Sequence, residues 1–511
     1  MPNLTPRDPP YGDDRIGPEE RAVPEAIASI RRGPGTPKDS AGAAAEIGRR
    51  YRAARAARLA TTGERPRVVV GCWELAHNAA GRGQILAGLH AARATGVEIR
   101  ILGCLFDRFG TEVWEPLRSL AMPPVHAIAA GYDDTGLPGR LLDLVLEHPC
   151  DLVHLSKPRM PNILLGLAAR AVWGAAVIVD LDDEELAFAG AETAADLDSI
   201  LAGGGAARLP PLVRLPKSEW TRFAVAMAGE FDAVTVVNEP LRGRYGGTII
   251  RHARDVPPPE RLAVSREAER ARLGIAPDRV VVGFLGTPRP HKGLVETASM
   301  IARAGCPAAM FLVIGDFVDP ELRRSLEGVP GVEVRLLGNQ PLERLPSLVA
   351  ACDVHVSLLD DASTVSAFQT PAKLTDALAG GLAVVGRPSP GTAEILDGVG
   401  GSAATLDEVG VELSRLLRDP AARRDRGRAG RAWYERHLTV EANARTLDGL
   451  VRTVLAKGPG SFRAGLADGL DLLLGRMLVG PGPEVRTGRG VRGPNRPGHA
   501  SDSGTDRRER A

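Results

Sequence analysis

Two stretches of the sequence carry the residue types that bind a diphosphate. In the first, residues 283–294 (GFLGTPRPHKGL), we predict a buried strand, a Gly-containing turn and the start of a helix. Arg289, His291, Lys292 and Gly293 stand at that helix start. An anion placed there meets free backbone N–H groups together with Lys and Arg side chains. The alternative is an ordinary Gly turn of an α/β fold.

The second stretch, residues 366–394 (SAFQTPAKLTDALAGGLAVVGRPSPGTAE), predicts a helix, a strand and a second helix. Thr370 suits the N-cap of the first helix and Pro371 its first position. Gly380 and Gly381 are expected to end that helix before the apolar run LAVVG. The start of the helix then lies close to a strand end.

Three charged side chains of the second stretch suit a nucleotide sugar. Lys373 and Asp376 fall within the first two helical turns, facing one cleft mouth, and Glu394 lies on the next helix. A Lys at a helix start neutralises phosphate, and a carboxylate accepts hydrogen bonds from ribose hydroxyls. The alternative is a plain connection with solvated charges.

Basic and acidic residues also follow two predicted strands of the N-terminal half. Lys157 and Arg159 follow the strand in HLSKPRMPN. The run VDLDDEEL ends in five carboxylates: Asp180, Asp182, Asp183, Glu184 and Glu185. Adjacent strands would bring these basic and acidic loops together. Three interpretations stay open for the carboxylates: a metal site, a general base or acceptor-hydroxyl contact, and a helix cap.

The elements that must position these residues are short apolar runs alternating with helix-like segments. Runs so apolar suit strands buried on both faces, as in a parallel sheet. Two successive series of them predict two doubly wound α/β halves, whose ligands bind outside the carboxyl ends of the strands. The expected strands are 68–73, 98–105, 151–156, 175–182 and 232–237, then 280–286, 310–316, 332–338, 353–359 and 382–386.

The chain divides into four predicted units. They are a disordered or helical extension (1–64), an N-terminal domain (65–255), a C-terminal domain with terminal helices (256–457) and a largely disordered tail (458–511). Within the extension, residues 1 to about 40 are expected to be disordered and 43–59 to be helical. Within the tail, residues 462–478 allow a short amphipathic helix.

Composition narrows the class of protein. The 511-residue chain has 44% hydrophobic and 25% charged residues, which is typical of a globular protein. Its net charge of +1 gives no overall positive electrostatic field that would attract nucleic acid. Its five scattered cysteines are expected to be reduced core residues. Neither a secretion signal nor a membrane span is predicted, so the expected location is cytoplasmic. The basic tail leaves a peripheral membrane contact as an alternative to a solvated tail.

The donor-side segments resemble family 4-like glycosyltransferases. GTPRPHKG resembles that family's glycine-rich loop, MFLVIGD its following strand, and LTDALAGGLAVVG its acidic helix and Val-rich strand. TPAKLTDALAGG is similar to the P-x-K variant of some bacterial members. The resemblance covers roughly residues 67–455 and implies the GT-B architecture, in which two Rossmann-like domains face a cleft.

The resemblance also implies a role for each donor-side residue. Asp376 would contact the ribose and Glu394 would lie beside the donor pocket. Phe368 stands where the family has its first motif glutamate, and Thr287 stands where it has an Arg, so Arg289 would substitute for that Arg. The donor phosphate would meet Gly286, Arg289, Lys292, Gly293 and Lys373.

For the acceptor side, the resemblance places a Gly-rich turn in AHNAAGRGQ. The turn, with Lys157 and Arg159, would line the acceptor side, and the candidate catalytic residues are His77, Asp182 and Asp183. Its turn residues are Gly81, Arg82 and Gly83.

The predicted reaction moves a sugar from a nucleotide diphosphate to a hydroxyl of a glycan or other acceptor. The resemblance implies retention of configuration. We expect no obligatory metal or cofactor, because enzymes of this kind neutralise diphosphate with side chains and helix ends. The nucleotide sugar is a co-substrate. A GT-B sugar epimerase and a catalytically silent nucleotide- or glycan-binding protein are the alternatives.

Overall fold

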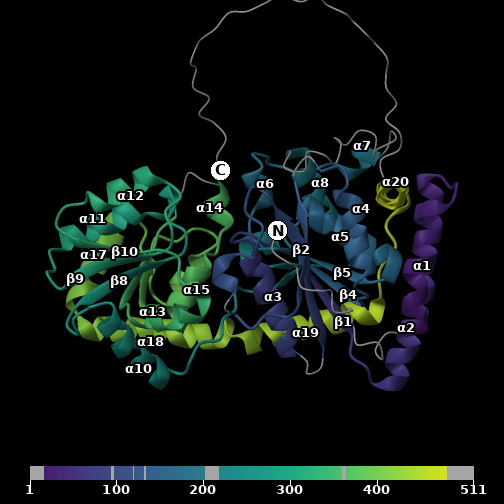
Figure 1. Cartoon of the computed structure of the whole chain (residues 1–511). Helices are drawn as coiled ribbons and strands as arrows, with labels where there is room; N and C mark the ends of the chain where they lie inside the picture. The colour runs from purple at the N-terminus through teal and green to yellow at the C-terminus, as the bar shows by residue number, and fades with distance from the viewer. Residues whose placement is uncertain are drawn as a thin grey trace, which may run out of the picture.

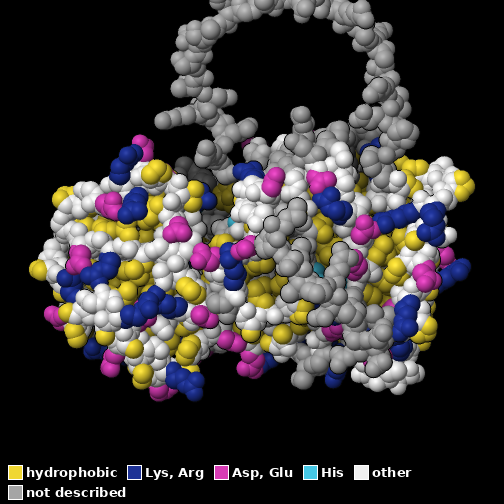
Figure 2. Space-filling view, in the orientation of Figure 1, with side chains coloured by type: hydrophobic (Ala, Val, Ile, Leu, Met, Phe, Trp, Pro, Cys, Tyr) yellow, Lys and Arg dark blue, Asp and Glu magenta, His cyan; other side chains and the backbone are white. Residues whose placement is uncertain are grey.

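The computed structural model describes residues 17–93, 97–118, 120–131, 134–201, 218–359 and 364–479. They form two α/β domains that lie side by side (Figure 1). Basic and acidic side chains are interspersed over the face shown in Figure 2, as the net charge of +1 leads one to expect.

The N-terminal domain is built on a seven-stranded parallel sheet with the order β3-β2-β1-β4-β5-β6-β7. Five of these strands are among those predicted. The edge strands β3 and β7 were not predicted, because β3 (VHAIAA) is half exposed and β7 has only two residues. The strands are β1 (Arg67–Cys72), β2 (Glu98–Phe106), β3 (Val125–Ala130), β4 (Leu152–Ser156), β5 (Ala176–Leu181), β6 (Ala233–Val236) and β7 (Thr248–Ile249).

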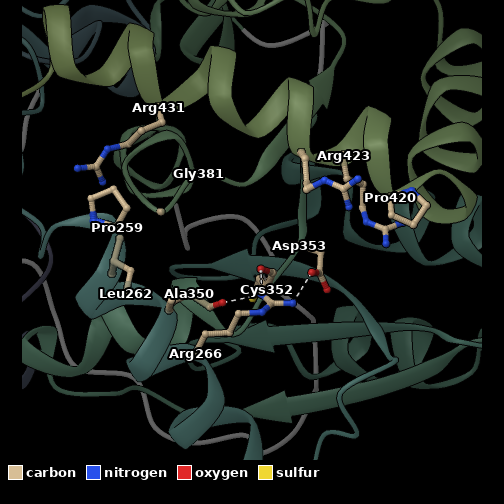
Figure 3. Close-up of a pocket in the computed structure, with 13 residues that line it drawn as sticks. Pro259, Leu262, Arg266, Ala350, Cys352, Asp353, Gly381, Pro420, Arg423 and Arg431 are labelled. Carbon is tan, nitrogen blue, oxygen red and sulfur yellow. Dashed lines mark hydrogen bonds and ion pairs between the residues drawn. The ribbon is translucent and has the colours of Figure 1, made fainter.

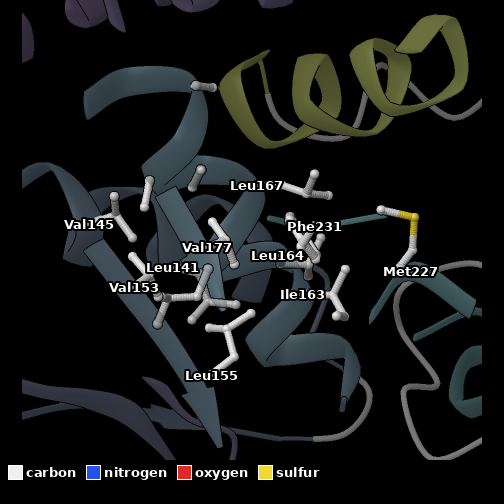
Figure 4. Packing of buried hydrophobic residues seen from close by; sticks show 14 of the residues in the cluster. Leu141, Val145, Val153, Leu155, Ile163, Leu164, Leu167, Val177, Met227 and Phe231 are labelled. Carbon is white, nitrogen blue, oxygen red and sulfur yellow. The ribbon is translucent and has the colours of Figure 1, made fainter. Parts of the chain in front are cut away.

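Helix α5 forms the centre of this domain's core. Its Ile163, Leu164 and Leu167 pack over Val153 and Val177 of the sheet (Figure 4). Burying each such side chain contributes about 1.5–3 kcal/mol. The helices of this domain are α3 (Ala80–Arg93), η2 (Glu115–Leu117), α4 (Leu137–Leu146), α5 (Met160–Trp173), α6 (Glu185–Phe188), α7 (Leu197–Leu201), α8 (Ser218–Ala228) and α9 (Glu239–Tyr245).

The C-terminal domain repeats the architecture with a five-stranded parallel sheet, ordered β10-β9-β8-β11-β12. All five strands were predicted. They are β8 (Val280–Leu285), β9 (Ala309–Ile314), β10 (Glu333–Leu337), β11 (Val354–Ser357) and β12 (Ala383–Gly386). The helices are α10 (Pro259–Arg272), η4 (Pro290–Lys292), α11 (Leu294–Ala304), α12 (Pro320–Glu327), η5 (Leu342–Arg344), α13 (Leu345–Ala350), α14 (Thr364–Phe368), α15 (Ala372–Ala379), α16 (Ala393–Gly398), α17 (Leu406–Arg418) and α18 (Pro420–His437).

Helix α19 (Val440–Lys457) returns the chain to the N-terminal domain. We expected it within the C-terminal domain, as part of residues 256–457. Instead, α18 and α19 run beneath both domains (Figure 1), and Leu447 and Val451 are buried in one cluster with Leu86 and Leu89 of α3. The correction has a simple cause: the apolar face of α19 was visible in the sequence, but not the surface that it covers.

The ends of the described chain also cover the N-terminal domain. Disorder up to about residue 40 was a wrong prediction from residue 18 onward, because α1 (Pro18–Arg32) and α2 (Pro37–Thr62) are helices. The buried Glu20 of α1 pairs with Arg58 and Arg67. The helix expected at 462–478 is confirmed as α20 (Ala464–Val479), which packs on α2 and α4. Residues 1–16 and 480–511 lie outside the described residues.

The cysteines are free, as expected. Cys72, Cys104, Cys150 and Cys352 are buried and Cys306 is half-buried. Within the part of the chain that the structure describes, no helix has the length and apolar character needed to cross a bilayer.

Candidate functional site

The predicted site residues of the N-terminal domain gather where β4 and β5 end. Lys157 follows β4, and its ammonium lies 2.7 Å from Asp182 Oδ1, 2.8 Å from Asp183 Oδ2 and 3.2 Å from Glu185 Oε1. Arg159 pairs with the same Glu185. The basic and acidic loops therefore meet, as the sequence predicted.

Lys157 is held in a strained conformation. Its φ is +76°, in the left-handed region that side chains other than Gly rarely adopt, and it is the single such residue among those that the structure describes. Strain of this kind costs about 1–3 kcal/mol and concentrates at functional sites. The strain turns the Lys157 ammonium onto the carboxylates that follow β5.

The two aspartates of the cluster have opposite protonation tendencies. Burial raises the pKa of Asp182 to about 6, although Lys157 acts against that rise. Burial also acts to raise the pKa of Asp183, but the charge and hydrogen bond of Lys157 outweigh it and the net shift is downward. Asp183 is thus a permanent carboxylate near neutral pH, whereas Asp182 is suited to accept a proton.

A side-chain cation lies at this cluster of carboxylates. Oxygen atoms of Asp182, Asp183 and Glu185 lie within 4.8 Å of one another, which is close enough to share a cation. The Lys157 ammonium already lies at hydrogen-bonding distance from all three carboxylates. The Lys157 ammonium therefore neutralises part of the negative charge of these carboxylates.

On the opposite domain, the predicted glycine-rich loop follows β8. Gly286 has a φ of +106° with open space around its Cα, and η4 then leads to Gly293, the N-cap of α11. Lys292 donates a hydrogen bond to the carbonyl of Thr287 across the loop (3.0 Å). The loop thus presents Lys292 where a strand ends and a helix begins.

Lys373 is buried without a hydrogen-bond partner for its ammonium. The nitrogen lies 3.8 Å from the centroid of the Phe284 ring. Burial lowers the pKa of Lys373 well below its ordinary value, and the nearby Lys292 lowers it further. Burial likewise lowers the pKa of Lys292, to about 8, with a second contribution from Arg289. These two neighbouring lysines, neither of them ion-paired with a carboxylate of the described residues, form a site for an anion, which would favour their charged forms.

The predicted Gly-rich turn of the N-terminal domain is part of a helix. Gly81, Arg82 and Gly83 lie inside the first turn of α3, not before it. Arg82 is 3% exposed and pairs through two hydrogen bonds with Asp180, both 2.8 Å long. A Cβ on Gly83 would lie 2.1 Å from Cys72 Sγ, so this residue serves helix packing. Arg82 also donates to the carbonyls of Ile250 (2.7 Å) and Arg251 (3.1 Å), so its guanidinium is bonded within the protein, and its acceptor role stays a prediction.

His77 is half-buried beside aromatic rings. Its ring centroid lies 4.2 Å from that of Phe109 and 5.5 Å from that of Trp73. Nδ1 accepts a hydrogen bond from the backbone of Ala79 (3.0 Å), which leaves the proton on Nε2. Burial lowers the pKa of His77 to about 4, helped by Lys157 and Arg159. This geometry offers a neutral hydrogen-bond donor at the predicted catalytic position.

The two carboxylates predicted to bind ribose and sugar are paired in this structure. Asp376 Oδ1 accepts a hydrogen bond from Arg254 (3.1 Å), and Glu394 accepts two from Arg251 (2.8 and 3.0 Å). Both arginines belong to the linker between the domains. Burial raises the pKa of Asp376, and the pairing with Arg254 opposes that rise.

The predicted cap of α15 is also different. Pro371, not Thr370, is the N-cap of α15, and it supplies no side-chain hydrogen bond. The Thr370 hydroxyl donates to the carbonyl of Gly391 (2.6 Å) and accepts from Asn238 (2.9 Å). Thr370 is thus used for a contact between domains rather than for the helix.

Two residues that join the domains were missed in the sequence. Gln369 donates a hydrogen bond to Asp183 Oδ1 (3.2 Å), and Asn238 donates to the carbonyl of Phe368 (2.7 Å). Asn238 carried a signal, because it directly follows a predicted strand. Gln369 carried none, since its partner lies 186 positions away in the chain.

A pocket of about 400 Å³ lies elsewhere in the C-terminal domain (Figure 3). Cys352, Asp353 and Gly381 place it at the amino ends of β11 and β12, opposite to the candidate site. Its Arg266 is already bonded to the carbonyls of Ala350 (2.7 Å) and Cys352 (2.8 Å). These contacts satisfy helix-end carbonyls and make the pocket a packing feature.

Comparison by sequence gives a match within the C-terminal domain. Residues 278–419 match the family model described as Glycosyl transferases group 1. The matched range contains Lys292, Lys373, Asp376 and Glu394. No curated protein matches the chain.

Comparison by structure identifies the architecture. A glycosyltransferase from Rickettsia africae ESF-5 has a TM-score of 0.53 at 11% identity, covering 77% of this chain and 99% of that one. Sucrose-phosphate synthase from Thermosynechococcus elongatus gives 0.51 at 17% identity, covering 77% and 100%. The catalytic domain of starch synthase IV from Arabidopsis thaliana, bound to ADP and acarbose, gives 0.52 at 14% identity, also covering 77% and 100%. The predicted GT-B architecture of two Rossmann-like domains is confirmed.

Proposed function

We propose that this protein is a glycosyltransferase that moves a sugar from a nucleotide diphosphate to an acceptor hydroxyl. The observation that carries the proposal is the pair of unneutralised lysines, Lys292 and Lys373, in the segment that matches the family model. A bound diphosphate would supply the anionic partner that the Lys373 amine lacks.

Catalysis in this proposal rests on the leaving diphosphate. As the bond from the anomeric carbon to the phosphate oxygen breaks, negative charge grows on the diphosphate, and Lys292 and Lys373 stabilise it. Arg289, near Lys292, adds a third positive charge. We propose no obligatory metal, because these side chains provide the positive charge that a metal would supply.

The acceptor enters from the N-terminal domain in this proposal. Asp182, with its raised pKa of about 6, takes the proton of the acceptor hydroxyl. Lys157 holds Asp182 and Asp183 in place, and His77 donates a hydrogen bond from Nε2. The finer assignment to family 4, with retention of configuration, is part of the proposal and is tested by the configuration of the product.

Release of nucleotide from a panel of nucleotide sugars tests the proposal. Turnover with at least one donor is expected, and Lys292→Ala should lower it by about 100-fold or more, as expected for a lost transition-state charge contact. Lys457→Ala, at an exposed position on α19, is the matched control. Unchanged turnover in Lys292→Ala would contradict the phosphate assignment.

Phe368 favours a second candidate, a silent nucleotide- or glycan-binding protein. Its apolar ring stands where the resemblance places a motif glutamate. The same panel separates the candidates: binding of nucleotide sugars without release of nucleotide or change of the sugar supports a silent protein. Release of a free altered sugar without transfer supports the epimerase.

A further inference from the structure

Residues 366–370 of the C-terminal domain reach across to the N-terminal domain. They include the end of α14, which lies between the two domains in Figure 1. Phe368 packs against the main core cluster of the N-terminal domain, and its ring lies 5.5 Å from the guanidinium carbon of Arg244 in α9. The segment is thus a bridge between domains rather than part of one wall.

Three hydrogen bonds fix this bridge to the N-terminal domain. The amide of Asn238 donates to the Phe368 carbonyl (2.7 Å) and to the Thr370 hydroxyl (2.9 Å). The amide of Gln369 donates to Asp183 Oδ1 (3.2 Å). One side-chain amide from each domain, Asn238 and Gln369, therefore makes these contacts.

The C-terminal domain holds the bridge firmly. The Gly391 nitrogen donates to the Ala367 carbonyl (2.9 Å), and the Gly391 carbonyl accepts from Thr370 (2.6 Å). A Cβ at Gly391 would lie 2.6 Å from the Gln369 carbonyl oxygen, so the loop around residue 391 packs directly on the bridge. Movement of one domain relative to the other must consequently break the contacts of Asn238 and Gln369.

We propose that Gln369 is a positioning residue that links closure of the two domains to the placement of Asp183. Among the described residues, its amide donates the one hydrogen bond that the C-terminal domain makes to Lys157 and the carboxylates around it. When the domains separate, Asp183 loses this donor and keeps Lys157 alone. The acceptor-side cluster is then complete only in the closed cleft. This inference rests on the proposed function for its catalytic meaning, but not for its structural part.

A negative charge introduced at Gln369 tests, without any substrate, whether this residue holds the two domains together. Small-angle scattering should show a larger radius of gyration for Gln369→Glu than for the wild type, because the new carboxylate faces that of Asp183. Adding Asp183→Asn should restore the wild-type value, since the repelling charge is removed. A matched control is Thr364→Ala, at an exposed position on α14, the helix that precedes Gln369. An unchanged radius in Gln369→Glu, or no recovery in the double variant, would overturn the proposal.

Asn238→Asp separates the bridge from the local helix. The Asn238 Oδ1 also accepts from the Leu241 nitrogen (3.0 Å) as the N-cap of α9, and Asp keeps that cap. The substitution removes only the donor to Phe368 and Thr370. We expect unchanged thermal stability of the N-terminal domain together with an increased radius of gyration. A closed protein after this change would also count against the bridge.

Turnover then tests the catalytic part. With a donor found by the panel, Gln369→Ala should lower kcat about tenfold and leave the KM of the donor nearly unchanged, and Gln369→Glu should lower kcat further. Equal kcat values for the two variants and the wild type would remove Gln369 from catalysis. If the wild type turns over no donor, the proposed function fails while the scattering results still decide the bridge.

Discussion

Lys373 is buried, and its side-chain nitrogen has no hydrogen-bond partner among the described residues. A buried amine that is 7% exposed and has no hydrogen-bond partner destabilises the folded protein. Its retention is explained by a ligand that stabilises the charged form. The free protein and the ligand complex should therefore respond in opposite directions to loss of this amine.

We expect Lys373→Met to stabilise the free protein by about 1 kcal/mol, because a buried unpaired amine is replaced by an apolar chain of similar length. The same change should weaken binding of a nucleoside diphosphate at least tenfold. Thermal unfolding and calorimetric titration measure the two effects, with Lys457→Met as the exposed control. A destabilised variant that still binds the nucleotide would contradict this assignment.

The pKa of Lys292, lowered to about 8 by burial, predicts a pH-dependent affinity. Above pH 8 the free protein holds Lys292 mostly neutral, so a diphosphate must bind together with a proton. Affinity should fall as pH rises through 8, by up to tenfold per unit. Titration calorimetry in buffers of different ionisation enthalpy should show proton uptake.

Lys292→Arg provides the control for this effect. Its guanidinium stays charged throughout the range, so the decline above pH 8 should be reduced. An equal decline in both proteins would assign the pH dependence to another group.

At the scale of elements, the loop between β8 and α11 requires Gly293. Its φ is +62°, and an added Cβ would lie 2.6 Å from the Cβ of Leu358. Gly305, the C-cap of α11, has a φ of +58° with nothing within 4 Å of an added Cβ. The two glycines share the backbone requirement, but only Gly293 has the packing requirement.

Gly293→Ala should therefore destabilise the C-terminal domain more than Gly305→Ala. Gly305→Ala, the control, should lose only the stability that a left-handed conformation costs an alanine, about 1–2 kcal/mol. Gly293→Ala must also displace Leu358, which typically costs about 1–3 kcal/mol more. Denaturant unfolding of both variants measures the difference. Equal losses of unfolding free energy in the two variants would show that the Leu358 side chain moves aside without cost.

Buried histidines shape the whole molecule's response to acid. His90 and His154 are fully buried, and their rings are joined by a 3.1 Å contact from His90 Nε2 to His154 Nδ1. His154 Nε2 in turn lies 3.0 Å from the Thr235 hydroxyl. Burial lowers the pKa of His154 to about 4, that of His355 to about 4 and that of His148 to about 3.

These shifts predict an acid-sensitive fold. The unfolded chain takes up a proton at each of these histidines below about pH 6.5, whereas the folded chain does not until about pH 4 or lower. Stability is therefore fully present above pH 6.5 and falls below it, by up to about 1.4 kcal/mol per pH unit for each histidine. Denaturant unfolding between pH 4.5 and 7.5 measures the slope.

His148→Gln is the informative variant for this prediction. Both ring nitrogens of His148 lack hydrogen-bond partners, so removing its titration should reduce the slope below pH 6.5 by about one histidine. A slope that is the same in the variant and the wild type would show that His148 does not titrate with unfolding.

The sequence by itself determined the architecture, the strand positions and the loops that carry charge. Apolar runs such as 280–286 and 310–316 identify buried parallel strands, because such strands need no alternation. The rule that ligands bind at strand ends then led to Lys157, Asp182 and Lys292. Local pattern sufficed for each of these inferences.

The tertiary structure alone decided which charges remain free. Arg82 was predicted to contact a ligand, but it is paired with Asp180. Asp376 and Glu394 are paired with arginines of the linker between the domains. Lys373, which the sequence placed at a helix start and in the P-x-K motif, is buried without a hydrogen-bond partner for its amine among the described residues. The physical reason is that pairing depends on distances between segments far apart in the chain, and neither spacing nor propensity encodes those distances.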